Sequence, residues 1–387
     1  MELLKFEIKK LLYGKTAMAA IAIMLCLIIL TGVGEVAGYY YTNGTPKTVY
    51  EEFVPYIGVT ANGYTLKQIR NKYNINLTTN NFSDGLHLRY LETFINMELY
   101  RYGKSSINPW YDEKAENPYS LSGILVLLNA LEQNGKENTY EYRMRQMQYE
   151  MMVSAGGPKV YYTWFWSTQR KAFRDSALLF FIFILLILSP IFTQEYSSGM
   201  DSIILSSKNG RRRIVTAKIL AGVVFSVIAI ILLNVIQLII YIIFGSASGW
   251  NPPLNSLYSF GLAPYKFSIA QYYIVQLLFQ VAAGLVLAIV IALISSRLKS
   301  SMYTFFIGAI FIIYPPILEG MFKIKGPIYD LSIFHAIFTD NVFVKFKAFN
   351  FFGYPVLYPY VLIPFLFIVG ILAACLIYKG FLRRDAC

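Results

Sequence analysis

Six long apolar runs divide this chain and determine the architecture that its sequence predicts. The runs cover residues 16–33, 176–192, 214–244, 269–294, 303–318 and 360–377. Each approaches the roughly 20 residues that an α-helix needs to cross about 30 Å of hydrocarbon. The pattern therefore predicts an all-α polytopic membrane protein with six transmembrane helices.

A short amphipathic segment precedes the first run, over residues 2–13. One helical face carries Leu4, Ile8, Leu11 and Leu12, and Lys5, Lys9 and Lys10 surround the other. This arrangement is typical of a helix that lies in the membrane interface. We expect residues 1–35 to form this interfacial helix and the first span.

Residues 36–170 differ from the rest of the chain because they are polar and rich in tyrosine. They contain 13 basic and 12 acidic residues, a balance that suits an exposed folded domain. Helical patterning appears over 66–73, 87–102, 120–133 and 139–152. We expect a helical extracytoplasmic insert between spans one and two, and a membrane domain with spans two to six over 171–387. The expected core of the insert comprises Leu91, Phe94, Ile95, Ile124, Leu125, Leu127, Leu128 and Leu131.

The composition and the placement of charge support this reading. Hydrophobic residues make up 56% of the chain and charged residues 14%, against roughly 25% charged in soluble domains. The net charge of +12 gathers beside the spans, at both termini and in alternate loops. Such basic segments mark the cytoplasmic side, so we expect a multi-pass protein of a bacterial cell membrane with both termini cytoplasmic. The charge pattern explains topology, and no nucleic-acid partner is expected.

The sequence offers little material for a catalytic or metal site. None of the three cysteines, Cys26, Cys375 and Cys387, lies in the insert, and the two histidines, His87 and His335, are far apart. Two segments, 14–16 and 103–105, imitate the end of a phosphate-binding loop, but the glycine required five positions before its last glycine is absent. We therefore expect an ATP-free, cofactor-free chain that is not itself an enzyme.

Polar residues inside the spans are few and fall in pairs. Asn234 and Gln237 share one face of the third run, and Gln276 and Gln280 share one face of the fourth. Such amides either join helices or line a translocation route, and the sequence leaves both roles open. Lys218, near the start of the third run, is expected to extend its charged end to the interface.

The most informative segment joins the second and third runs, over residues 193–213. It contains Gln194, Glu195, Gly199, Asp201, Leu205, Lys208 and Arg211. With Lys218 and the six-span plan, this segment resembles the loop of ABC type-2 exporter permeases, in which a short coupling helix docks on an ATPase. The resemblance implies that these seven residues are the candidate coupling residues. The likeness covers the membrane part and excludes the insert. Two departures are the turn Lys208-Asn209-Gly210, where the family often has proline, and the length of the first outer loop.

The resemblance implies a permease subunit of an ATP-driven exporter. Its implied partners are cytoplasmic ABC ATPase subunits that hold ATP and Mg, a second permease copy or homologue, and membrane lipid. The implied cargo is an amphipathic, peptide or lipid-like substrate. Two alternatives remain: a membrane protein of similar build that transmits force to the insert without transport, and an intramembrane enzyme.

Overall fold

A computed structural model describes residues 2–43, 50, 51, 54, 57, 58, 120–156, 159, 161–200, 210–245, 251–324 and 326–382. Its long helices are α1 (Glu2–Tyr13), α2 (Lys15–Asn43), α6 (Leu121–Gln133), α7 (Tyr140–Ala155), α8 (Trp164–Leu188), α9 (Pro190–Ser198), α11 (Gly210–Gly245), α12 (Ile269–Arg297), α13 (Ser301–Phe322) and α17 (Tyr358–Leu382). The shorter elements are η2 (Leu254–Ser256), η3 (Tyr258–Phe260), α14 (Pro327–Asp330), α15 (Ile333–Ile337), α16 (Asp340–Phe343), β1 (Ala348–Phe351) and β2 (Tyr354–Leu357).

The described residues contain six helices that are long and apolar enough to cross a membrane, which agrees with the predicted polytopic class. These spans are Lys15–Gly38, Trp164–Ser198, Arg212–Phe244, Ile269–Arg297, Ser301–Phe322 and Tyr358–Gly380. Each contains the whole of one of the six apolar runs. Because hydropathy alone determined these runs, the number and order of the spans followed directly from the sequence.

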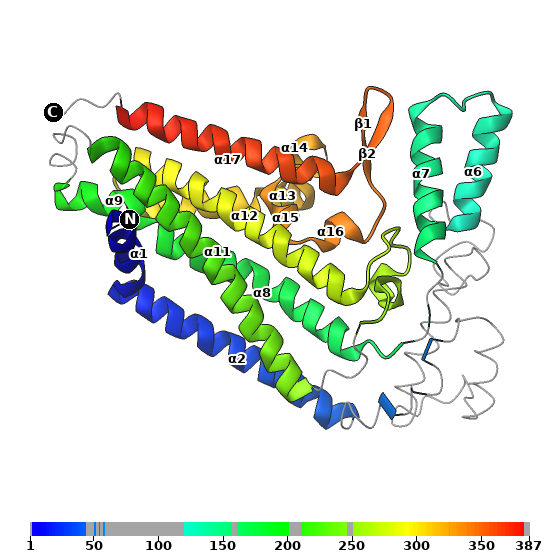
Figure 1. Ribbon diagram of the computed structural model, residues 1–387, viewed down its shortest axis with the longest axis horizontal. Helices are drawn as coiled ribbons and strands as arrows, with labels where there is room; N and C mark the ends of the chain where they lie inside the picture. Colours follow the sequence, from blue (N-terminus) through cyan, green and yellow to red (C-terminus); the bar gives the residue numbers. More distant parts are fainter. Residues whose placement is uncertain are drawn as a thin grey trace.

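The spans run side by side and give the molecule two distinct ends (Figure 1). The first is the end at which α1 and α9 lie and α17 finishes, and we call it the basic end because Lys5, Lys9, Arg212 and Arg213 are exposed there. The second carries α6, α7 and the β1–β2 hairpin, and we call it the insert end. Helix α1 lies across the spans at the basic end.

Helix α12 is the centre of the bundle. It contacts α8, α9, α11, α13, α15 and α17, and Ser268 and Gln271 form a capping box at its start. The small residue Gly284 allows α11 to approach closely, because a Cβ there would lie 2.3 Å from Cδ1 of Ile230. Small residues at such crossings let the helix backbones pack tightly.

The insert end is joined to the segment between the last two spans. Helices α6 and α7 pack through Ile124, Leu128 and Met152. The hydroxyl of Tyr140 on α7 donates to the carbonyl of Ala348 at 3.0 Å. Arg143, also on α7, donates to the carbonyl of Gly353 at 3.0 Å. The antiparallel β1–β2 hairpin thus connects α7 to the start of α17. It is a short element that the sequence did not predict, and the all-α class still describes the chain.

The helices next to the insert extend beyond the predicted domain boundaries. Helix α2 continues to Asn43, and α8 begins at Trp164, so both enter the range 36–170. Because Arg170 and Lys171 are charged, the sequence predicted that the second span begins after them. In the structure Arg170 forms an ion pair with Asp340, and Lys171 lies 3.6 Å from Glu35. These partners compensate the charge at the insert end of the bundle.

The predicted core of the insert is only partly described. Leu91, Phe94 and Ile95 lie outside the described residues, as do the predicted helices 66–73 and 87–102. Ile124 and Leu128 are buried, and Leu127 and Leu131 are half-buried. Leu125 is 43% exposed, so its assignment to the core was wrong. It follows Ile124 by one position and therefore lies on a different helical face from the buried Ile124 and Leu128.

Candidate functional site

Helix α9 is a short helix that directly follows α8 and forms the last part of the Trp164–Ser198 span. Pro190 occupies its first position, where a missing backbone N–H costs no hydrogen bond. Gly199 ends it with φ of +68°, a left-handed conformation that favours glycine. The sequence therefore determines both boundaries of α9.

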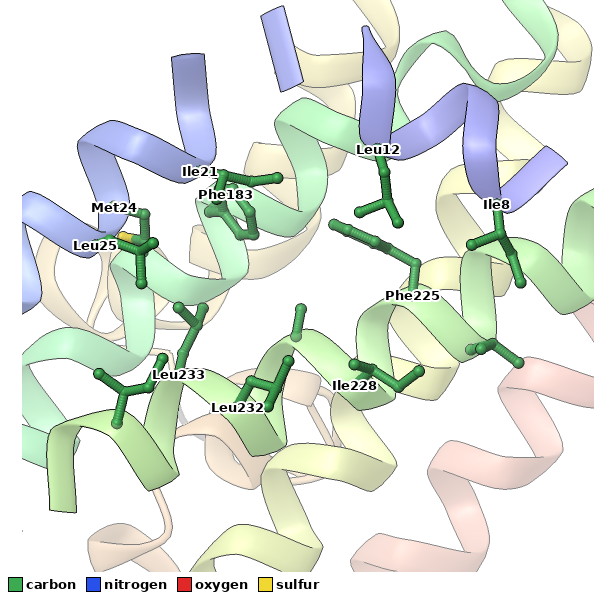
Figure 2. Close-up of a pocket in the computed structure, with 13 residues that line it drawn as sticks. Ile8, Leu12, Ile21, Met24, Leu25, Phe183, Phe225, Ile228, Leu232 and Leu233 are labelled. Carbon is green, nitrogen blue, oxygen red and sulfur yellow. The ribbon is translucent and has the colours of Figure 1, made fainter. Parts of the chain in front are cut away.

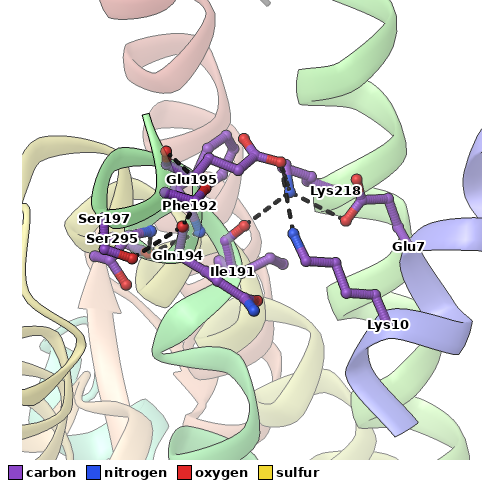
Figure 3. Close-up of polar contacts among 11 residues, drawn as sticks. Glu7, Lys10, Ile191, Phe192, Gln194, Glu195, Ser197, Lys218 and Ser295 are labelled. Carbon is purple, nitrogen blue, oxygen red and sulfur yellow. Dashed lines mark hydrogen bonds and ion pairs between the residues drawn. The ribbon is translucent and has the colours of Figure 1, made fainter. Parts of the chain in front are cut away.

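A buried ion cluster ties α9 to α1 and α11 (Figure 3). The Nζ atom of Lys218 on α11 lies 2.6 Å from Oε1 of Glu195 on α9 and 3.0 Å from Oε2 of Glu7 on α1. Lys218 also donates to the carbonyl of Ile191 at 2.9 Å. Lys10 approaches Glu195 at 3.7 Å. Two carboxylates and two ammonium groups thus balance in charge, as buried ions require.

Hydroxyl groups hold the opposite side of α9. Ser295 near the end of α12 accepts from the backbone N–H of Phe192 at 3.0 Å and donates to the carbonyl of Ser189 at 3.0 Å. The hydroxyls of Thr193 and Ser301 lie 2.6 Å apart, which joins α9 to α13. Helix α9 is therefore bonded to α1 and α11 on one side and to α12 and α13 on the other.

The edge of α9 that faces away from these contacts is open. Gln194, Ser197 and Ser198 are exposed, and so are Gly199 and Met200 directly after them. We call these five residues the α9 surface. Of the other predicted coupling residues, Asp201, Leu205 and Lys208 lie outside the described residues. Arg211 is in the first turn of α11, but its side chain also lies outside the described part.

Lys218 and Glu195 take positions that the sequence analysis did not predict. Lys218 was expected to extend to the interface, yet its side chain is 0% exposed. Glu195 was placed among the coupling residues, and its side chain is 8% exposed. Each ion is satisfied inside the protein because α1 folds over the site. A signal existed in α1, since Glu7 lies on the same helical face as Leu4 and Leu11.

The predicted polar pairs inside the spans form hydrogen bonds between helices. Asn234 on α11 donates to Oε1 of Gln280 on α12 at 3.0 Å, and Gln280 donates to the carbonyl of Ile337 at 3.4 Å. Gln237 donates to the hydroxyl of Ser176 on α8 at 3.1 Å. Gln276 is 2% exposed. This geometry is that of helix packing, and three of the four amides are used in it.

A double-mutant cycle on Asn234→Leu and Gln280→Leu is expected to show coupling in the free energy of unfolding. Hydrogen bonds between transmembrane helices contribute about 0.6 kcal/mol on average and up to about 1.7 kcal/mol. Equilibrium unfolding in detergent measures the four stabilities. The matched cycle, Gln237→Leu with Gln280→Leu, should give almost none, because these residues bond to different partners. Equal coupling in the two cycles would contradict the assigned pairing.

His335 lies at the insert end and is buried. Its ring packs edge-on against Tyr329 with centroids 4.7 Å apart. Burial lowers the pKa of His335 to about 4, which keeps the imidazole neutral at physiological pH. Near it, Lys347 forms an ion pair of 2.5 Å with Asp330. These contacts fix the segment between α13 and α17.

The described residues contain no group of three histidine, cysteine, aspartate or glutamate side chains placed to hold a metal ion. No model of a known protein family matches the chain, and no curated protein matches its sequence.

Proposed function

We propose that this chain is the membrane subunit of an ATP-driven ABC exporter. Separate cytoplasmic ATPase subunits would bind ATP and Mg and dock on the α9 surface. A second copy of the chain or a homologue would complete the membrane part. The cargo would be an amphipathic, peptide or lipid-like molecule.

One observation carries this proposal: α9 has one open edge and is bonded to four other helices. A partner that pushes on the α9 surface would act through Glu195 on Lys218, and through Lys218 on Glu7. The same push would reach α12 and α13 through Ser295 and Ser301. A short helix connected in this way suits the transmission of force from an ATPase to the spans.

The location of α9 also supports the proposal. It lies at the basic end, where exposed lysine and arginine residues favour the cytoplasmic side. An ATPase that uses cytoplasmic ATP would reach this end. The insert would then lie outside the cell, as the sequence predicts.

A second candidate function is force transmission to the insert without transport. The contacts of α7 with the β1–β2 hairpin favour it, because the hairpin leads directly into α17. Movement of α17 would reach the insert through these hydrogen bonds. This candidate shares the ATPase and the α9 surface with the exporter.

Purification of the chain from its native membrane in mild detergent is expected to recover an ATP-hydrolysing subunit. Recovery of this activity supports both candidates, and its absence under conditions that keep the chain folded contradicts both. Export by the reconstituted complex separates them. A transporter moves cargo across a sealed vesicle when ATP is supplied, whereas a force transmitter hydrolyses ATP and leaves the contents of the vesicle unchanged.

A further inference from the structure

An apolar cavity lies between α1, α2, α8 and α11, and we call it the lateral cavity (Figure 2). Its volume is about 250 Å³, and every side chain that lines it is apolar. A cavity of about 150 Å³ with such walls remains dry and admits a benzene ring. The lateral cavity therefore has room for several methylene groups and offers no partner to water.

The cavity opens toward the side of the bundle. Leu12, Ile228 and Leu232 line it and are 36%, 51% and 53% exposed. Met24, Phe183 and Phe225 form its inner wall and are less than 9% exposed. In a bilayer, the medium at such an opening is the hydrocarbon of lipid tails. A tail that enters would contact side chains that surrounding lipid does not reach.

Helix α1 places positive charge beside the cavity. Two of its cavity-lining residues are Ile8 and Leu12. Lys5 precedes Ile8 by three positions and Lys9 precedes Leu12 by three, so each lysine neighbours a lining residue on the helix surface. Both lysines are exposed. Their charges suit the phosphate of a lipid headgroup, since a basic residue near an anionic membrane surface is favourable.

We propose that the lateral cavity binds one acyl chain of an anionic phospholipid of the leaflet at the basic end. The chain lies against Met24, Phe183 and Phe225, and its headgroup phosphate lies near Lys5 and Lys9. Because α1 also supplies Glu7 to the ion cluster, the lipid helps to hold α1 against α11. The proposal does not depend on transport.

Photo-crosslinking of lipids to the full chain in nanodiscs tests this site. Phosphatidylglycerol with a diazirine on one acyl chain is incorporated and irradiated, and its adducts are mapped by mass spectrometry. We expect adducts on Met24, Phe183 and Phe225, as well as on the lipid-facing residues Phe306 and Ile310 of α13. Adducts confined to exposed residues would overturn the proposal, and this result requires no variant.

Variants then test the cavity and the headgroup contact separately. Ala229→Phe fills the cavity and should remove the adducts on its inner wall, whereas Ile239→Phe, at an exposed position of α11, should leave them. Together, Lys5→Gln and Lys9→Gln should reduce labelling by phosphatidylglycerol about fivefold for each lysine, with little change for phosphatidylcholine. Equal reduction for the two lipids would exclude the anionic headgroup. The recovery of ATPase with the purified chain does not depend on lipid in this cavity. If these lipid tests fail, the exporter proposal is therefore still decided by ATPase recovery.

Discussion

Replacing Lys218 with methionine is expected to destabilise the protein more than any other single change at the basic end. The side chain is fully buried and forms ion pairs with both Glu7 and Glu195. Without it, two buried carboxylates remain, and among the described residues only Lys10 is a cation near them. Breaking a buried ion pair in this way costs about 3–5 kcal/mol of folding free energy. Thermal unfolding in detergent should show a large decrease in the melting temperature.

Two controls separate the buried cluster from a general effect of charge. Lys5→Met removes an exposed lysine and should change stability by about 0.5 kcal/mol or less. The triple variant Glu7→Leu, Glu195→Leu and Lys218→Met replaces the central ions with apolar groups and should recover most of the loss, because a packed apolar substitute avoids the cost of burying charge. If the Lys218→Met protein had the same melting temperature as the wild type, the cluster would contribute little to stability.

The second large effect is expected at the α9 surface. Ser197→Trp and Ser198→Trp together place two large rings where the ATPase is proposed to dock. Overpacking of a close interface costs about 1–3 kcal/mol, which corresponds to a roughly 5- to 150-fold weaker complex. The recovery of ATPase with the purified chain measures this loss.

The matched control for this variant is Ser154→Trp, an exposed serine on α7 at the insert end. It adds the same side chain on a helix that is proposed to lie outside the cell, so ATPase recovery should remain unchanged. The melting temperatures of both variants should stay close to that of the wild type. Full recovery of ATPase with both tryptophans in α9 would remove this surface from the proposed mechanism.

The sequence predicted the spans because their apolar runs are long and local. The start of α8 was missed because Arg170 resembles a loop residue until Asp340, 170 positions later, is known to lie beside it. The β1–β2 hairpin was missed because its strands have four residues each, too few for a clear alternation.

The internal contacts of the candidate site could not be predicted from the sequence. The segment around Gln194 and Gly199 does contain a short exposed helix end, and its boundaries follow from Pro190 and Gly199. The partners of Glu195 could not be read from this segment, because Glu7 and Lys218 come from helices distant in sequence. A carboxylate on the apolar face of α1 was the available signal. The role of the α9 surface as a docking site remains a prediction.

Site-specific crosslinking from α9 in intact cells tests the central claim most directly. A benzophenone amino acid at position 197 replaces Ser197, and the same group at Lys266, exposed at the insert end, serves as the control. Irradiation is expected to link position 197 to a soluble ATP-binding protein, identified by mass spectrometry, and to give no such product from position 266. Adducts from position 197 with lipid alone, in cells where the chain is folded and inserted, would contradict the account.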